Sequence, residues 1–247
     1  MGRFLFKQFS VKQEQSAMKV NTDGVLLGAW CSMPPVPREG DMINVLDVGT
    51  GTGVIALMVA QRLAPYGIKA QITGIDPDIP SACEAQSNFS ESSWGENMMS
   101  QALSLKEYLE TSPPKANLIV SNPPYFKNSL KAPCSRRSNA RHTDNLSFNE
   151  LIECSASLLS PGGVLSVILP AEAEREFVSV AASNGLSLFR LCRVSTVAGE
   201  EPRRIMMEFT GETSGDINEE RLSIQKSPGG LFTNEYKMVT ADFYLKF

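Results

Sequence analysis

The stretch that decides the fold is Val45-Leu46-Asp47-Val48-Gly49-Thr50-Gly51-Thr52-Gly53, an apolar run that leads directly into alternating glycines. A short apolar run that enters a glycine-rich turn and then a helical pattern is typical of the first strand, turn and helix of a parallel α/β sheet. Glycines let a ligand approach the backbone closely, and the following helix presents unpaired N–H groups at its start. The turn therefore predicts a polar ligand at the carboxyl edge of a sheet.

Apolar runs and helical patterns alternate along the rest of the chain, as they do where crossover helices join parallel strands. The predicted strands cover residues 43–48, 71–76, 98–103, 117–121, 163–169, 186–195 and 204–210. The predicted helices cover residues 54–65, 78–92, 148–160 and 172–184, and the tail adds a strand at 222–225 and a short helix. We expect an α/β fold of the Rossmann-like, doubly wound type. Its seven-stranded sheet would be mostly parallel with an antiparallel last strand, and a short N-terminal extension would precede it.

The composition excludes several classes of protein. The 247 residues are 42% hydrophobic and 20% charged, with a formal net charge of −4, which describes a globular domain. No apolar stretch approaches the roughly 20 residues that span a bilayer, and the N-terminus lacks the apolar core of a signal peptide, so we expect a cytoplasmic protein. Five scattered cysteines and a single histidine, His142, argue against a metal site, a disulfide framework and histidine-based hydrolysis.

Two carboxylates indicate which ligand the turn would take. Asp76 ends the next predicted strand, where a carboxylate accepts the hydroxyl groups of a ribose, and Asp78 is a weaker alternative that is better placed to cap the following helix. The turn lacks the Gly-Lys-Ser/Thr of an ATP-binding loop, and its G-x-G-x-G spacing differs from that of dinucleotide sites. Asp47 would repel a pyrophosphate but attract a sulfonium or an amino group. The pattern therefore favours S-adenosylmethionine.

A second motif, Asn122-Pro123-Pro124-Tyr125, follows the strand predicted at 117–121. The two prolines stiffen the turn and have no N–H groups to compete for nearby carbonyls. The side-chain oxygen of Asn122 and the carbonyl of Pro123 would accept the hydrogens of a planar amine and so localise its lone pair. Tyr125 offers a flat face on which a base can stack. The motif predicts chemistry at an amide or arylamine nitrogen.

In this order and spacing, the glycine turn, Asp76 and the Asn-Pro-Pro-Tyr motif resemble class I S-adenosylmethionine-dependent methyltransferases that act on amino groups. The segments 6–9 and 17–30 and the ending Phe243-Tyr244-Leu245 narrow the resemblance to the bacterial tRNA(Val) adenine-37 N6-methyltransferase family, over nearly the whole chain. The resemblance implies S-adenosylmethionine as cofactor, tRNA as partner and the N6 amine of adenine 37 as target. It also implies that residues 1–42 form an extension that covers the cofactor and contacts RNA, and that residues 43–247 form the methyltransferase domain.

The matching positions suggest a role for individual residues. The predicted catalytic residues are Asn122, Pro123, Pro124 and Tyr125. The predicted cofactor-binding residues are Thr22, Asp23, Asp47, Gly49, Gly51, Gly53, Asp76, Ser104, Leu105 and Asn122. Thr22 and Asp23 match the segment that closes over the cofactor in related enzymes. Ser104-Leu105 stands where many relatives carry an acidic residue near the cofactor adenine, so this chain departs from the pattern there.

Basic residues follow the catalytic motif directly, with no acidic residue among them. The predicted RNA-binding residues are Lys127, Lys131, Arg136, Arg137 and Arg141. Basic residues also outnumber acidic ones in the first 20 positions. Because physiological salt screens charges beyond about 8 Å, a phosphate near these segments responds to them rather than to the overall negative charge. An acidic protein can therefore bind tRNA.

Two rival functions remain open from the sequence. A protein glutamine N5-methyltransferase would use the same kind of corner, but such enzymes usually carry a helical N-terminal domain, for which 42 residues are too few. A nucleoside-binding protein without turnover is the second rival. Transfer of a labelled methyl group into RNA rather than protein would separate the three, and a monomer is the favoured oligomeric state.

Overall fold

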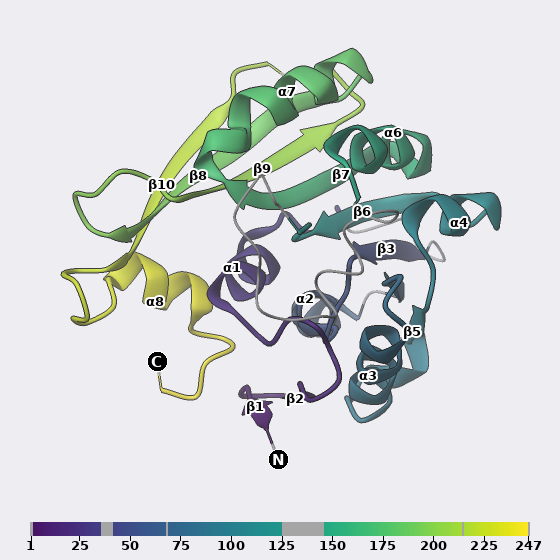
Figure 1. The fold of residues 1–247 in the computed structure, drawn as a ribbon, viewed down its shortest axis with the longest axis horizontal. Coiled ribbons are helices and arrows are strands. Elements are labelled where there is room, and N and C mark those ends of the chain that lie inside the picture. The colour runs from purple at the N-terminus through teal and green to yellow at the C-terminus, as the bar shows by residue number, and fades with distance from the viewer. Residues whose placement is uncertain (1, 36–41, 68, 125–145, 214, 247) are drawn as a thin grey trace.

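The computed structural model describes residues 2–35, 42–67, 69–124, 146–213 and 215–246, with one large sheet at its centre (Figure 1). The strand order in this sheet is β10-β8-β9-β7-β6-β3-β4-β5. The strands are β3 (Ile43–Val48), β4 (Ala70–Ile75), β5 (Met98–Gln101), β6 (Ala116–Ser121), β7 (Leu159–Pro170), β8 (Ser187–Val197), β9 (Arg204–Thr210) and β10 (Asn218–Gln225). Five of them, β5-β4-β3-β6-β7, are parallel neighbours, which confirms the doubly wound α/β fold.

The other end of the sheet has one strand more than the sequence predicted. β9 is antiparallel to both of its neighbours, as expected for the seventh strand, but it lies between β7 and β8. β10 continues the sheet as an eighth strand, parallel to β8. Its first half, Asn218-Glu219-Glu220-Arg221, carries no apolar residue. An edge strand needs few apolar side chains, so hydrophobic patterning indicated only its second half.

Helices cover both faces of the sheet (Figure 1). On one face lie α1 (Thr22–Trp30), α2 (Val54–Leu63), α3 (Ile79–Ser90) and α8 (Asn234–Thr240), and on the other lie α4 (Leu105–Glu110), α6 (Phe148–Leu158) and α7 (Glu174–Ser183). Successive strand residues point to opposite faces, so Val45 packs in the first core and Leu46 in the second. Apolar packing therefore covers both faces of the sheet, and the ends of the strands remain available for a polar ligand.

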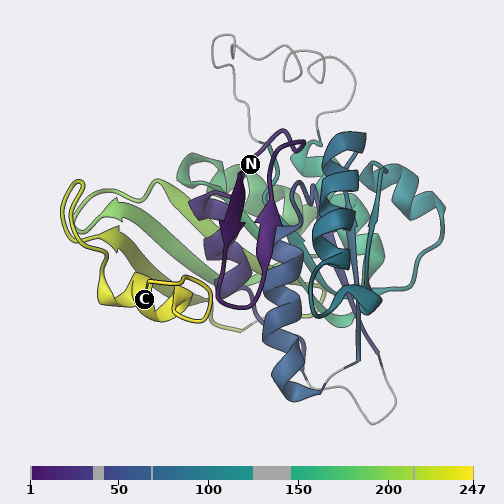
Figure 2. The same ribbon diagram turned by 90° about the horizontal axis from the view of Figure 1, so that it is seen from below.

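The N-terminal segment packs against this framework. β1 (Arg3–Leu5) and β2 (Ser10–Lys12) form a small antiparallel hairpin that lies beside α3 (Figure 2). α1 was not predicted as a helix from the sequence. It is capped by Asn21, whose side chain accepts a hydrogen bond from the N–H of Gly24. Its residues Val25, Leu26 and Leu27 are fully buried. The division of the chain at residue 42 stays a prediction.

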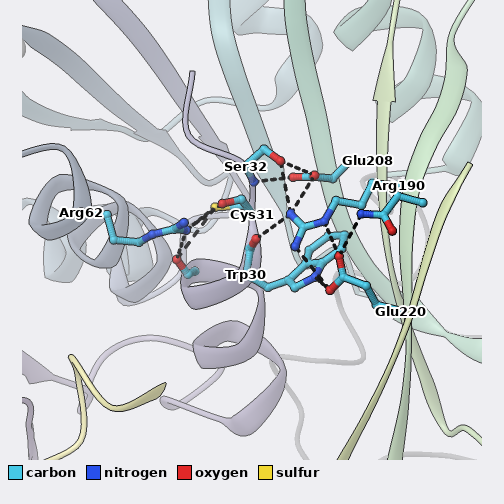
Figure 3. Close-up of polar contacts among 9 residues, drawn as sticks. Trp30, Cys31, Ser32, Arg62, Arg190, Glu208 and Glu220 are labelled. Carbon is cyan, nitrogen blue, oxygen red and sulfur yellow. Dashed lines mark hydrogen bonds and ion pairs between the residues drawn. The ribbon is translucent and has the colours of Figure 1, made fainter. Parts of the chain in front are cut away.

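A partly buried polar network fixes the C-terminal end of α1 at the amino edge of β8 (Figure 3). Arg190 of β8 donates to Glu208 of β9 at 3.3 Å and to Glu220 of β10 at 2.7 Å, and its guanidinium carbon lies 4.1 Å from the centre of the Trp30 ring. Ser32 donates its N–H and its hydroxyl to Glu208. α1 therefore crosses one face of the sheet, and its N-terminal end reaches toward the carboxyl edge.

Two kinds of feature are absent from the described residues. None of their helices is long and apolar enough to cross a membrane. Within the same residues, no three histidine, cysteine, aspartate or glutamate side chains are grouped so that they could hold a metal ion.

Candidate active site

Three predicted site segments meet at the carboxyl edge of the sheet. β3 lies between β4 and β6, and its last residue Val48 pairs with Ile75 on one side and with Ser121 on the other. The Ser121 hydroxyl donates to the Val48 carbonyl at 2.9 Å, which holds the ends of β3 and β6 together. Asp76 and Asn122 follow directly in the chain. They therefore flank the glycine turn (residues 49–53) that leaves β3.

The glycines of this turn serve two purposes. Gly49, Gly51 and Gly53 all have positive φ, at 72°, 55° and 79°, so a side chain would strain the backbone at each position. A Cβ at Gly53 would also lie only 2.4 Å from the ring of Phe89, so packing within the protein explains this glycine. A Cβ at Gly49 would meet no atom within 4 Å. The turn is thus closed by packing at its helix end and open at its strand end, where a ligand can approach.

Asp76 is held beside the turn by the backbone. Its carboxylate accepts hydrogen bonds from the N–H of Gly51 at 3.0 Å and from the N–H of Asp78 at 2.9 Å. Burial raises the pKa of Asp76 above its ordinary value, although both hydrogen bonds oppose that rise. The Asp78 side chain instead accepts from the N–H of Ser81 at the start of α3, which confirms the expected cap. Asp76 is therefore the carboxylate that faces the turn.

Asp47, the penultimate residue of β3, is a fully buried carboxylate. One oxygen accepts from the Thr50 hydroxyl at 2.8 Å and from the N–H of Ala56 at 3.3 Å. The other oxygen has no hydrogen-bond partner among the described residues. Burial raises the pKa of Asp47 to about 7. A buried carboxylate with an unsatisfied oxygen favours a cationic group nearby, which is the charge that S-adenosylmethionine carries.

The Asn-Pro-Pro corner follows β6, between the ends of β3 and β7. Asn122 is half-buried, Pro123 is buried and Pro124 is exposed. The structure thus brings Asn122 to the same strand edge as the glycine turn. Tyr125 lies outside the described residues, and so do the predicted RNA-binding residues Lys127, Lys131, Arg136, Arg137 and Arg141.

Thr22 and Asp23 open α1 at the carboxyl edge, where they lie beside the ends of β8, β9 and β10. Asp23 forms an ion pair with Arg204 at the start of β9, in which the arginine Nε lies 2.8 Å from the Oδ2 of Asp23. Both residues line an open cavity of about 1180 Å³ that the ends of β8 and β10 also line. Their predicted contact with the cofactor stays a prediction.

Ser104 and Leu105 both have structural partners. Ser104 begins α4 and exchanges hydrogen bonds with Glu107, because its side chain accepts from the Glu107 N–H and its own N–H donates to the Glu107 carboxylate at 2.8 Å. Leu105 is buried in the core under α4 and α6. The pair follows β5 at the carboxyl edge, and its role toward the cofactor adenine also stays a prediction.

One polar side of α3 was not predicted from the sequence. Glu84 and Asn88 are buried there and bind the backbone of the N-terminal segment. No motif marks these two residues. Their spacing of one helical turn was the available signal, but an exposed helix face shows the same spacing.

Known proteins resemble the chain over its full length. The model of the methyltransferase small domain family matches residues 33–181. A relative from Bacteroides fragilis is 41% identical over 244 residues, which cover 98% of both chains, and one from Photobacterium profundum is 38% identical over 246 residues, again covering 98% of both. Both are named tRNA1(Val) (adenine(37)-N6)-methyltransferase.

Solved structures share the fold at low sequence identity. A predicted O-methyltransferase from Agrobacterium tumefaciens is 18% identical with a TM-score of 0.67, over 90% of this chain and 96% of that one. A Listeria monocytogenes protein described as a class I S-adenosylmethionine-dependent methyltransferase is 15% identical with a TM-score of 0.56, over 88% of this chain and 65% of that one. The family model, the full-length relatives and the geometry of the carboxyl edge agree, so the chain belongs to the methyltransferase small domain family and is an S-adenosylmethionine-dependent methyltransferase.

Proposed function

We propose that this protein methylates the N6 amine of adenine 37 in a valine tRNA. The observation that carries the proposal is the position of the Asn122-Pro123-Pro124 corner, which leaves β6 directly beside the glycine turn that leaves β3. The corner suits a planar nitrogen, and the turn suits the methyl donor. The names of the full-length relatives support the same substrate.

The donor would lie along the glycine turn. Gly49 provides the open approach, Asp76 provides a fixed carboxylate for the ribose hydroxyls, and Asp47 provides negative charge beneath the turn. S-adenosylmethionine supplies a methyl group made electrophilic by a positively charged sulfur. Ionised Asp47 would stabilise that charge in the bound state, and its electrostatic effect is strong because the carboxylate is shielded from water.

Asn122 and Pro123 would activate the amine. The N6 nitrogen of adenine is a weak nucleophile because its lone pair is delocalised into the ring. The amide oxygen of Asn122 and the carbonyl of Pro123 would accept its two hydrogens and hold the lone pair in line with the methyl carbon. The carbon–nitrogen bond would form as the carbon–sulfur bond breaks, and the surplus proton of the amine would leave to solvent. Tyr125 would stack on the base.

The target base must leave the anticodon loop stack to reach this corner. Unstacking costs a few kcal/mol, least for a base that is already single-stranded. The basic residues that follow Tyr125 in the sequence, from Lys127 to Arg141, would bind the phosphates around it. Binding to tRNA should therefore weaken steeply as salt rises.

A labelling experiment tests the proposal. The protein is incubated with methyl-labelled S-adenosylmethionine and either a valine tRNA transcript or the same transcript with adenine 37 replaced by guanine. We expect N6-methyladenosine at position 37 of the first transcript, located by mass spectrometry, and no label in the second. Label in added protein instead of RNA would indicate the glutamine methyltransferase, and equal labelling of both transcripts would exclude adenine 37.

A further inference from the structure

One side of α3 binds the N-terminal strap, defined here as residues 12–17. Ser81, Glu84 and Asn88 lie on this side at helical spacing, and their exposed fractions are only 2%, 5% and 1%. The strap runs antiparallel to the helix, since Lys12 lies at Asn88 and Ala17 lies at Ser81. Three buried polar side chains thus follow a single segment of backbone along the helix.

Glu84 makes the central contacts. One of its carboxylate oxygens accepts from the N–H groups of Glu14 at 2.7 Å and Gln15 at 3.0 Å, and the other accepts from the N–H of Ser16 at 2.8 Å. Within the described part of the chain, no lysine or arginine forms an ion pair with Glu84. The three N–H groups therefore compensate its buried charge, and the strap takes its shape from the carboxylate.

Asn88 joins the strap to the glycine turn. Its side chain exchanges two hydrogen bonds with the backbone of Lys12, accepting at 2.8 Å and donating at 3.0 Å. The same amide nitrogen donates to the carbonyl of Thr52 at 2.9 Å. The start of the strap and the end of the glycine turn are therefore held by one buried side chain.

The other end of the strap lies against the middle of the turn. The Ser16 hydroxyl oxygen would be 3.5 Å from a Cβ placed at Gly51, whose N–H binds Asp76. The same hydroxyl lies 3.3 Å from that of Ser81, which donates to Asp78 at 2.6 Å. Glu84 thus determines where Ser16 lies relative to the part of the turn that fixes the ribose-binding carboxylate.

We propose that Glu84 is a positioning residue for the methyl donor, because it folds the N-terminal strap into a wall of the donor site. Glu84 acts through the strap and does not itself touch the donor. The proposal rests on the donor site and not on the identity of the methylated RNA, so binding measurements without RNA test it separately from the proposed function.

Glu84→Gln is the direct test. The amide keeps the size of the side chain, but its NH₂ group would face a backbone N–H, so at least one hydrogen bond to the strap is lost. We expect the dissociation constant of S-adenosylmethionine, measured by calorimetry, to rise about tenfold. At saturating donor, kcat should stay within about threefold of wild type. Glu110→Gln is the matched control, since Glu110 is an exposed residue at the end of α4, on the opposite face of the sheet from α3 and the strap.

Hydrogen exchange gives a second readout for Glu84→Gln. The amides of residues 14–16 should exchange faster, while those of β3 and α2 should keep wild-type protection. Faster exchange in the strap with unchanged donor affinity would overturn the proposal, and so would a large loss of kcat at unchanged affinity.

Ser16→Leu keeps the test decisive if Glu84→Gln does not fold. This variant leaves Glu84 in place and adds bulk beside Gly51. It should weaken donor binding at least about fivefold with little change in melting temperature. Wild-type affinity in this variant would overturn the proposal.

Discussion

The two edges of the sheet bury charge in opposite ways. At the amino edge, Glu208 is fully buried and receives hydrogen bonds from Arg190 and Ser32, and Arg190 is bound in turn by Glu220 (Figure 3). At the carboxyl edge, Asp47 is just as buried, but it accepts only from neutral groups and keeps one oxygen unpartnered among the described residues.

This difference distinguishes a structural network from the proposed donor site. The pKa of Glu220 is lowered, because the hydrogen bonds from Arg190 and Trp30 outweigh its partial burial. Burial dominates at Asp47 and raises its pKa to about 7, and no cation among the described residues compensates its charge. The amino edge is electrostatically complete without a ligand, whereas at the carboxyl edge the proposed methyl donor would supply the positive charge that Asp47 lacks.

The largest effect on stability is expected from Arg190→Met. This variant leaves Glu208 buried without its cation, which costs about 3–5 kcal/mol of unfolding free energy. Urea denaturation measures the loss. Arg193→Met is the control, because its ion pair with Glu174 is partly exposed and should contribute less than about 1 kcal/mol. Equal losses in the two variants would mean that the network around Arg190 contributes no more to stability than a partly exposed ion pair.

Asn122→Ala should impair catalysis at the carboxyl edge without unfolding the protein. Turnover is expected to fall about 100-fold or more, because the amine loses an acceptor needed in the transition state, while donor affinity stays within about twofold. Single-turnover methylation and calorimetry measure the two quantities. Asn97→Ala, at an exposed site before β5, should leave both unchanged. Unchanged turnover in Asn122→Ala would reject the catalytic corner.

Asp47→Asn tests how the buried carboxylate at the carboxyl edge makes stability depend on pH. Because the pKa of Asp47 is raised in the folded state, the native protein holds a proton there that the unfolded chain releases, so this group stabilises at low pH and loses that effect as pH rises through about 7. The Asn variant lacks this dependence. The difference in unfolding free energy between Asp47→Asn and wild type should therefore shift by about 2–3 kcal/mol in favour of the variant between pH 5 and pH 8. Urea denaturation at the two pH values measures this difference. A constant difference would show that Asp47 titrates normally.

The same variant should also bind the donor differently. Wild-type affinity for S-adenosylmethionine should increase as pH rises through about 7 and Asp47 ionises. Asp47→Asn should lose that part of the increase, as calorimetry at several pH values would show. Parallel pH profiles in the two proteins would indicate that Asp47 does not act on the donor.

Arg204→Gln should have the smallest effect. The ion pair between Arg204 and Asp23 is partly exposed, so its loss should cost less than about 1 kcal/mol and disappear in 1 M salt. Thermal melts at low and high salt measure this. A larger, salt-independent loss would place a second structural network at the carboxyl edge.

The sequence predicted the elements whose signals are local. β3, the glycine turn and α2 follow one another directly, and Asp78 caps the helix that starts beside it. The first half of β10 was missed because it binds β8 through backbone groups and carries polar side chains. Glu84 reads as an ordinary exposed helix residue until residues 14–16 are placed on it. Such contacts depend on the tertiary arrangement, which spacing within a helix does not reveal.

The hydrogen bonds between Lys12 and Asn88 span 76 positions of the chain. During synthesis, the first dozen residues leave the ribosome long before the helix to which they attach. They have no docking partner until α3 has emerged and folded against β4 and β5. Methyl-donor affinity should therefore not appear before α3 has left the ribosome and folded, well after the strap itself has been made.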